Sequence, residues 1–599
     1  MVQARSGIAN GSVNSINRRT LAAQLRGVAL IAAFFAILPP PGSAHDRSEA
    51  ARATDSPFAS PQALLVARNT EPVLFAQVSP VVPPTMTSEQ IQPVTEPTGP
   101  SATETIRGFL FTGNTVIATT YLDSITRPYI GQPIALPTLE EAAKSVSDLY
   151  RKRGYTLATA YLMPQDIKGG IVEIAILEGR IGDVTITGNT HYSTEFIKGH
   201  FAGAMKEPVA RNASLERGLL LLNEYPDLKT SARLEPGKST GTTDAYITAK
   251  DKRPMHFMLD FNNYGFNRIS RYRFGIGAEV GNVLMDGATL TLNAILGNHP
   301  DQLVFGMGNY SVPLGTNGTK LVLGASKGKF DVGGELAFLE IRGHITTYDV
   351  AVTHPFIKSR FENLLAEVGF ASKDNRLLIL DNLFGTDAVR ALKLGVNWDR
   401  LDLSGRWYAS AYGFQGLGHV LGGMENDSQQ ATRLGTDNRF TKGTLSGGRI
   451  QSLGHDVLLV LRGSGQITTG PVVFIEQMML GGPDSVRGYQ MGERFVDEGY
   501  AVTAETRIPF FPSFMPSSLK QTQGVVFIDH GKGRVRNPQP GEQQSTSLTG
   551  TGVGLQTQLP WYNTNFRFDV GFPIGPKPIG GTISGDRSPT FYIQINTKF

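Results

Sequence analysis

Apolar and polar residues alternate along many short segments of residues 255–599. At the start of this region, Met255, Phe257, Leu259 and Phe261 occupy every second position. A repeat of two places these side chains on one face of an extended chain, which is the pattern of a β-strand with one apolar face. The same period recurs to the last residue, where one face carries Phe591, Ile593, Ile595, Thr597 and Phe599 and the other carries Tyr592, Gln594, Asn596 and Lys598.

Two kinds of β-structure have one apolar face: a soluble sandwich and a membrane barrel. A sandwich of 345 residues without a domain break would be unusual, and Lys, Gln and Asn recur in the middle of the strands. Apolar outer faces toward lipid and polar inner faces toward water fit a transmembrane antiparallel β-barrel. At about 20 residues per strand with its connection, the region predicts roughly 14 to 18 strands and an aqueous lumen.

A smaller unit appears twice before the barrel. Gly113-Asn114 and Gly188-Asn189 each follow an apolar strand end and precede Thr, 75 residues apart. Gly-Asn is a natural turn pair. The first copy continues with an amphipathic helix at 139–150 that ends at Gly154. The remaining elements that we predict are strands at 155–162 and 171–177 in the first copy, and a helix at 215–222 with strands at 230–234 and 244–249 in the second.

The first 103 residues predict an export signal followed by a linker. Arginines precede the apolar run 27–38, prolines end it, and small residues at 42–44 offer a cleavage site, so we predict a signal peptide at 1–44. As a membrane anchor, a run of 12 residues would be too short to span a bilayer. Residues 45–103, with seven prolines between Pro72 and Pro100, read as an extended linker. Residues 60–67 could form a short helix or belong to the unstructured linker.

Composition and charge argue against several classes of function. The net charge of +4 comes without a dense basic run, so we expect no nucleic-acid partner. The chain has no cysteine, and its ten histidines lack zinc-site spacing. Gly550 to Gly554 is glycine-rich but lacks the lysine of a phosphate loop, and Asn317 reads as part of a loop rather than a glycan site. We therefore expect no cofactor, no metal and no enzymatic activity.

One motif is specific enough to suggest a family. Glu476-Gln477-Met478, followed by Leu480 to Tyr489 with Val486-Arg487-Gly488-Tyr489, resembles the signature loop of the two-partner secretion (TpsB-type) transporters, which export haemolysin- and adhesin-type exoproteins. The repeated unit resembles the polypeptide-transport-associated (POTRA) domain, and the family carries two of these before a 16-stranded barrel. The resemblance implies POTRA domains at 104–180 and 181–253 and a barrel at 254–599. It also implies a barrel-assembly signal at the carboxyl end, with Phe591, Ile593, Ile595 and Phe599.

The family also carries a strand motif with Phe, Asp and Gly at alternate positions, here Phe527, Asp529 and Gly531. In relatives the loop between strands 11 and 12 folds back into the barrel and its arginine pairs with this aspartate. The resemblance therefore implies a pair between Arg487 and Asp529, and strand alternation places Val526 and Ile528 toward lipid. Arginine can meet a carboxylate with two parallel hydrogen bonds. The alternative is an exposed arginine on an outer loop.

The resemblance implies an outer-membrane pore with periplasmic POTRA domains that bind an unfolded exoprotein, its secreted TpsA-type partner. Unpaired edge strands in such domains can accept an extended chain; alternatively, the domains only position the barrel. The other expected partners are outer-membrane lipid and the barrel-assembly machinery. An outer-membrane insertase is a second hypothesis, because the same superfamily contains one. A passive porin or an enzyme barrel is a third, which the paired modules and the loop motif disfavour.

Overall fold

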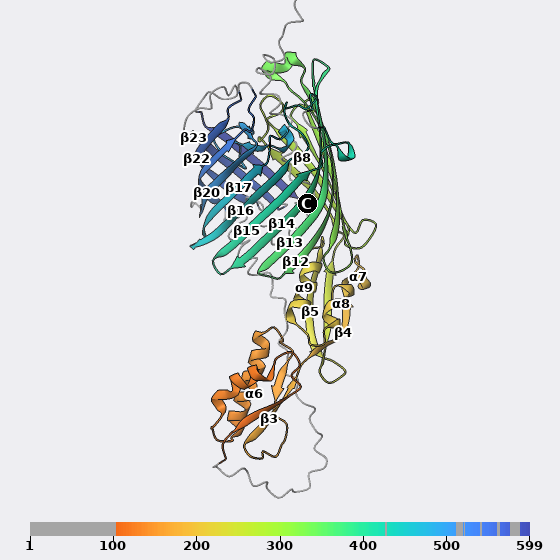
Figure 1. The fold of residues 1–599 in the computed structure, drawn as a ribbon, viewed down its shortest axis with the longest axis vertical. Helices are drawn as coiled ribbons and strands as arrows, with labels where there is room; N and C mark the ends of the chain where they lie inside the picture. Colours follow the sequence, from red (N-terminus) through yellow and green to blue (C-terminus); the bar gives the residue numbers. More distant parts are fainter. Residues whose placement is uncertain are drawn as a thin grey trace, which may run out of the picture. The chain divides into compact units, whose positions relative to one another are not determined.

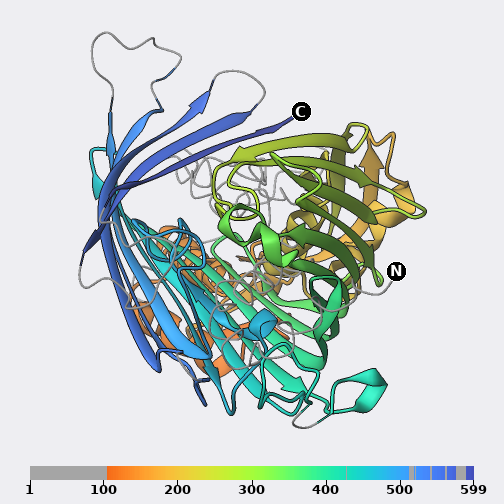
Figure 2. The same cartoon turned by 90° about the horizontal axis from the view of Figure 1, so that it is seen from above.

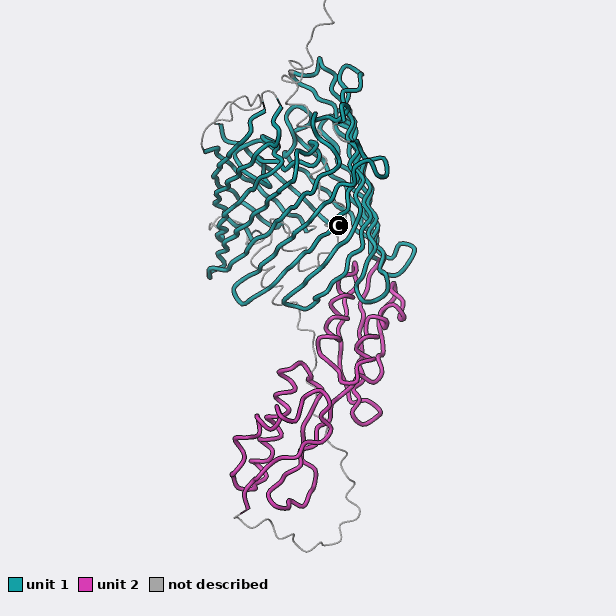
Figure 3. The backbone as a smooth tube through the Cα atoms, viewed as in Figure 1, with its two compact units in different colours: residues 1–68, 254–599 teal, residues 69–253 magenta. Residues whose placement is uncertain are grey.

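The computed structural model describes residues 104–599 except 426–427, 511–518, 520, 540–541, 560–562 and 575–587. The predicted signal peptide at 1–44, the linker at 45–103 and the helix at 60–67 lie outside the described residues. The described chain separates into two compact units that meet in sequence at residues 253 and 254 (Figure 3). In the part of the chain that is described, no helix combines the length and the apolar character needed to cross a membrane.

The first module of the amino-terminal unit is a three-stranded sheet covered by helices. Its strands lie in the order β1-β3-β2, and β1 is parallel to β3. The apolar spacing of α6 predicts its buried face correctly, since Leu139, Val146 and Tyr150 are buried. The elements are β1 (Gly108–Thr112), α5 (Thr119–Thr126), η2 (Arg127–Tyr129), α6 (Leu136–Lys152), β2 (Thr159–Tyr161) and β3 (Ile171–Leu177).

The strand predicted at 155–162 is wrong in length. Only residues 159–161 are extended. The amide of Tyr155 donates to the Tyr150 carbonyl, and the amide of Ala158 donates to the Tyr155 carbonyl. The chain therefore continues to turn after α6, and apolar residues in these turns imitate the start of a strand.

The second module repeats this arrangement with the order β4-β6-β5. The predicted helix and the two predicted strands after it are present as α9, β5 and β6. Two short helices were not predicted, because five or six residues carry too little periodicity to detect. The elements are β4 (Arg180–Thr187), α7 (Thr194–Gly199), α8 (Ala202–Lys206), α9 (Asn212–Leu222), β5 (Leu228–Pro236) and β6 (Thr242–Asp251).

The Gly-Asn turns have the same geometry in both modules. Gly113 and Gly188 have φ of 84° and 88°, which favour glycine. The side-chain amide of Asn114 donates to the carbonyl of residue 117 at 3.0 Å, and that of Asn189 donates to the carbonyl of Tyr192 at 2.9 Å. The repeat that the sequence indicates is therefore a repeat of hydrogen bonds as well as of residues.

A carboxylate at the end of the last strand of each module, or directly after it, secures the chain after this turn. Glu178 accepts from the amides of Thr115 and Val116 at 2.8 and 3.1 Å. Asp251 accepts from the amides of residues 190, 191 and 192 at 2.7 to 3.0 Å. Burial by itself would raise the pKa of Asp251, but the hydrogen bonds from Thr190 and its neighbours outweigh this effect and lower the pKa to about 2.

Sixteen antiparallel strands of the carboxy-terminal unit close into a barrel, with β24 paired to β7 (Figures 1 and 2). This confirms the predicted transmembrane barrel of about 16 strands. The strands are β7 (Met255–Asn262), β8 (Arg273–Gly281), β9 (Thr289–Gly297), β10 (Leu303–Pro313), β11 (Lys320–Asp331), β12 (Arg342–Lys358), β13 (Glu362–Ile379), β14 (Asn382–Asp402), β15 (Gly405–Gly416), β16 (Thr441–Gly454), β17 (Val457–Thr468), β20 (Glu498–Pro509), β21 (Gln523–Arg534), β22 (Ser545–Leu559), β23 (Thr564–Ile574) and β24 (Thr590–Lys598).

Alternation along the strands divides the side chains between the two faces as the sequence predicts. In β21, Val526 and Ile528 are each 52% exposed on the outer face, whereas Phe527 and Asp529 are buried inside. The glycine-rich stretch at 550–554 lies within β22, as a barrel strand. We call the end of the barrel where the chain enters β7 the inner end and the opposite end the outer end.

Candidate functional site

The motif loop, residues 469–497, connects β17 to β20, the eleventh and twelfth strands of the barrel. We call it the lumen loop. It contains a 3-10 turn, η5 (Phe474–Glu476), and two short strands, β18 (Met478–Leu480) and β19 (Arg494–Val496), which pair antiparallel. The hairpin leads the chain away from the ends of β17 and β20. Its tip, residues 485–489, contacts the lumen-facing side of the barrel wall.

Arg487 at the tip is fully buried and bound to Asp529 of β21. Its Nε donates to Asp529 Oδ2 at 2.7 Å, and its Nη2 donates to Oδ1 at 2.9 Å. The Arg487 amide also donates to Oδ2, at 3.0 Å. The guanidinium carbon lies 3.3 Å from the centre of the Phe527 ring. The structure thus brings together the two motifs through a two-pronged hydrogen bond with an aromatic face beneath it.

Two further carboxylates face the same guanidinium. Arg487 Nη1 lies 2.8 Å from Glu505 Oε2 of β20 and 3.4 Å from Asp569 Oδ2 of β23. Arg567 contacts both of these acids, at 2.9 and 2.8 Å, and Arg507 contacts Glu505 at 2.8 Å. Three guanidinium groups therefore face three carboxylates in this network. The sequence did not predict a role for Glu505, Asp569, Arg507 and Arg567, although each is a charged residue within a strand.

The rest of the tip fits closely against the wall. Gly488 has φ of +98°, and a Cβ there would lie 2.7 Å from the carbonyl carbon of Phe572. Its amide donates to the Tyr592 hydroxyl at 3.0 Å, and that hydroxyl donates to the Tyr489 carbonyl at 2.5 Å. The Tyr489 hydroxyl donates to the Thr549 carbonyl at 3.2 Å. This close approach requires glycine at position 488.

Glycines of the wall make room for the tip. A Cβ at Gly531 would lie 2.9 Å from Cγ2 of the buried Val486, so the glycine of the strand motif leaves space for the loop. Side chains at Gly550 and Gly571 would collide with the backbone of Arg487 and Gly488. The sequence did not indicate this role for Gly550 and Gly571, because glycine is frequent throughout the barrel.

A second polar anchor holds the stem of the lumen loop. Its carboxylate, Glu476, belongs to the signature motif, but the sequence did not predict its lysine partners. Glu476 is buried and bonds Lys373 of β13 at 2.8 Å through Oε1 and Lys442 of β16 through Oε2. The side chain of Gln466 donates to the Glu476 carbonyl at 2.8 Å. Together these contacts fix η5 to a wall of the barrel.

Asp497 lies at the end of the lumen loop and accepts four hydrogen bonds. Arg433 Nη1 donates to its Oδ1 at 3.0 Å, as does the Val472 amide. The Gln477 side chain also donates to Oδ1, at 3.1 Å, and the Arg536 amide donates to Oδ2 at 2.7 Å. Asp497 therefore joins the lumen loop to the connections that follow β15 and β21.

The outermost contacts of the tip and of the stem reach opposite sides of the barrel. In the ring order that begins with β7, β13 is the seventh strand and β23 is the fifteenth of sixteen. Lys373 and Asp569 therefore stand on walls half a circumference apart. A loop that contacts both must cross the lumen, so the lumen loop obstructs passage in this conformation.

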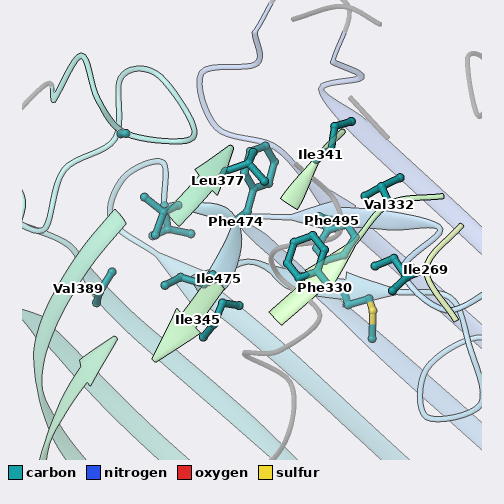
Figure 4. Close-up of a cluster of buried hydrophobic side chains, with 14 of the residues drawn as sticks. Ile269, Phe330, Val332, Ile341, Ile345, Leu377, Val389, Phe474, Ile475 and Phe495 are labelled. Atoms are coloured by element: carbon teal, nitrogen blue, oxygen red, sulfur yellow. The ribbon is translucent and has the colours of Figure 1, made fainter. Parts of the chain in front are cut away.

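An apolar cluster surrounds the stem at the outer end of the barrel. Phe474, Ile475 and Phe495 of the lumen loop are buried with side chains from the outer ends of β10 to β13, including Phe330 and Leu377 (Figure 4). Burial of such side chains contributes about 1.5 to 3 kcal/mol each. The cluster therefore adds apolar contacts to the hold of the Glu476 anchor.

The terminal residues that resemble an assembly signal line the closing seam. Phe591, Ile595 and Phe599 are exposed on the outer face. The Phe599 amide donates to the Phe257 carbonyl at 2.9 Å. Across the described parts of the chain, no group of three or more His, Cys, Asp or Glu side chains is placed to hold a metal ion.

Comparison with known proteins supports a specific family. Residues 241–557 match the family described as haemolysin secretion/activation protein ShlB/FhaC/HecB, and residues 105–179 match the ShlB-type POTRA domain. The heme/hemopexin transporter protein HuxB of Haemophilus influenzae is 26% identical over 459 residues, which are 74% of this chain and 78% of HuxB. The outer membrane transporter CdiB-2 of Burkholderia pseudomallei is 23% identical over 76% of this chain and 77% of its own.

Solved structures support the same fold. CdiB from Escherichia coli superposes with a TM-score of 0.70 at 18% identity and covers 92% of this chain and 97% of its own. CdiB from Acinetobacter baumannii gives a TM-score of 0.63 at 17% identity and covers 83% of this chain and 90% of its own. Since the family match alone spans more than half of the sequence, the chain belongs to the haemolysin secretion/activation protein family ShlB/FhaC/HecB, the outer-membrane transporters of two-partner secretion.

Proposed function

We propose that this transporter binds an unfolded exoprotein partner through its periplasmic modules and exports it through the barrel once the lumen loop moves aside. The observation that carries the proposal is the crossing of the lumen by a loop held through ion pairs. A loop held by polar contacts at a water-filled lumen can exchange those contacts for water, which a continuous apolar plug cannot do. The same loop can therefore close the resting pore and yield to a passing chain.

The tip anchor has a positioning role in this proposal. Arg487 is bonded to Asp529 through both its side chain and its amide, so the tip remains in one place while other parts of the loop move. Glu476, Asp497 and the apolar cluster around Phe474 and Phe495 hold the stem. Release of the stem with the tip retained would open one side of the lumen and keep the loop attached to β21.

Strand β5 offers the longest place for an extended substrate in the periplasmic modules. In the order β4-β6-β5 it pairs with β6 on one side only. It is nine residues long, whereas the edge strand β2 of the first module has three. Addition of an extended chain to such an edge binds main chain and tolerates many side chains. This suits a transporter whose substrate is long and unfolded.

A photo-crosslinking residue at Ser231, which is exposed on β5, tests this contact during secretion. We expect crosslinks from Ser231 to the exoprotein and few from the control position Glu195, which is exposed on α7. Equal yields from the two positions would contradict an edge-strand site on β5.

Deletion of the gene separates export from the alternative of an insertase. If the protein is an exporter, one large secreted protein disappears from the medium while other outer-membrane proteins keep their levels. Depletion of many outer-membrane proteins would instead support the insertase. The two modules before the barrel favour export, because a longer array is expected of an assembly factor.

The terminal Phe599 fits a role in biogenesis, with the barrel-assembly machinery as the partner. Its side chain is exposed on the outer face, and its carbonyl accepts from His256 Nδ1 at 3.0 Å. The exposed apolar residues of the outer face supply the contact with membrane lipid.

A further inference from the structure

The outer face of the wall from β11 to β13 changes from apolar to basic toward the outer end. The pairing register aligns Leu323, Val350 and Phe370 across the three strands. Toward the outer end, the next row of outward-facing side chains contains Ala325 and Tyr348. The row after it contains Lys327 with Thr346 and Asp374, and the following row contains Lys329, His344 and Arg376. Tyrosine is typical of the level where hydrocarbon meets headgroups. The basic rows therefore begin just beyond the apolar band.

The strands of this wall are long enough to pass through the membrane and beyond it. Strands β12, β13 and β14 have 17, 18 and 21 residues. About 9 to 11 residues of a tilted strand suffice to cross the hydrocarbon core. The outer parts of these strands consequently stand at the headgroup level of the outer leaflet. Figure 1 shows β12, β13 and β14 as neighbours in this wall.

Three basic side chains of this patch stay outside the close ion pairs of the described residues, although Asp331 and Asp374 lie nearby. Lys327, Lys329 and Arg376 are exposed, and they make none of the ion pairs found in the described chain. The nearby acids are engaged elsewhere, since Asp374 pairs with Arg390 at 2.8 Å and Asp331 lies 3.9 Å from Arg342. Lys327, Lys329 and Arg376 are therefore the cations of this wall that are free of close ion pairs and exposed to a ligand.

The spacing of these cations suits a phosphorylated headgroup. Lys329, His344 and Arg376 are directly aligned on three adjacent strands, and neighbouring strands lie about 4.8 Å apart. Lys327 lies two residues from Lys329 on the same face, about 7 Å along the strand. Long side chains across such a span can converge on one phosphate or divide between two. Arginine and lysine are the residues that bind phosphate in proteins.

We propose that Lys327, Lys329 and Arg376 form a binding site for the phosphates of lipopolysaccharide, the phosphorylated glycolipid of the outer leaflet. The acyl chains would lie against the apolar rows below, and the phosphates would meet the basic rows above. His344 adds a hydrogen-bond donor at the centre of the patch. Bound lipid would secure the projecting wall whose inner face carries Lys373, the partner of Glu476.

The test compares the full-length protein with the triple variant Lys327→Gln/Lys329→Gln/Arg376→Gln, both purified in mild detergent. Lys532→Gln is the matched control, because Lys532 is also exposed on the outer part of a strand, β21. Bound lipopolysaccharide per barrel is measured by mass spectrometry, and the shift on heating before electrophoresis verifies that each barrel is folded. We expect the triple variant to retain at least about fivefold less lipopolysaccharide than the unchanged protein, with the control unaffected.

Two further arms identify the ligand. Purified lipid A should rebind to the delipidated protein, whereas dephosphorylated lipid A should bind several-fold more weakly. Inorganic phosphate at millimolar concentration should not displace the lipid if the site uses both phosphates and acyl chains. Equal retention by the folded triple variant, equal binding of the dephosphorylated lipid, or full displacement by free phosphate would each overturn the proposal.

Discussion

Glu476 offers a sharp test of the closed lumen, because one carboxylate neutralises two lysines on the wall. In Glu476→Gln the fold of the loop can persist, but Lys373 and Lys442 lose their shared anion. The side chains of Glu476 and Lys442 are 2% and 8% exposed, whereas that of Lys373 is 19% exposed. Water can reach Lys373 and reduces the free-energy cost of leaving its charge without a partner. We therefore take the lower end of the range for breaking a buried ion pair, about 3 kcal/mol.

If this energy is lost only from the closed conformation, the ratio of closed to open pores falls by roughly 100-fold. Single-channel recording in planar bilayers measures that ratio directly. We expect longer and more frequent openings in Glu476→Gln than in the unchanged protein. A matched control is Asp456→Asn, which makes the same chemical change in an exposed turn at the inner end, where φ of 59° also suits asparagine.

Openings of the folded Glu476→Gln barrel that are no more frequent than those of the Asp456→Asn control would contradict the role of the Glu476 anchor. That result would mean that Asp497 and the apolar cluster around Phe474 and Phe495 hold the stem without Glu476. A variant that opens often but still exports would show that the stem anchor closes the resting pore and is not required for transport.

Three other changes have defined outcomes. Gly488→Ala should reduce export strongly with normal barrel levels in the membrane, because the added Cβ meets the backbone at Phe572 and displaces the tip; the assay is exoprotein in the medium against folded barrel by heat shift. The pKa of Asp251 lies below its ordinary 3.8, at about 2, so its contribution to stability is complete above about pH 4 and is lost as the pH falls toward 2. Asp251→Asn should remove this contribution to the pH dependence of the urea midpoint of the amino-terminal unit. Pulse proteolysis of the whole chain measures that midpoint. Deletion of Phe599 should lower the amount of folded barrel several-fold without changing synthesis, and unchanged levels would exclude a role for this residue in assembly.

Local patterns were sufficient to predict most of the fold. The period of two places Val526 outward and Asp529 inward, and the periodicity of α6 identifies its buried face, because both depend on neighbours within one element. The strand at 155–162 was overestimated because burial in a turn and burial in a strand leave the same apolar residues. The position of the turn is set by hydrogen bonds to Tyr150, which composition does not reveal.

The polar contacts of the site likewise separate into those that a local motif indicates and those that depend on residues distant in the sequence. The Arg487 and Asp529 pair could be anticipated only because the two motifs resemble those of a family with a known loop arrangement. Glu476 and Lys373 are 103 residues apart, and their contact depends on which strands of a closed ring face one another. No single-sequence pattern contains that information. The contacts of Arg487 with acids on β20, β21 and β23 likewise depend on the closure of the strands into a barrel.

The most direct test of the account is export by Arg487→Ala. The change removes a buried guanidinium that faces Asp529, Glu505 and Asp569, and it leaves Arg567 and Arg507 to hold two of these acids. The measurement is the amount of exoprotein in the medium per folded barrel in the outer membrane. We predict normal barrel levels with export lowered by at least about tenfold, as expected when a buried pair of about 3 to 5 kcal/mol is broken. Export at the normal level by correctly inserted Arg487→Ala would contradict the claim that the lumen loop must be held at its tip.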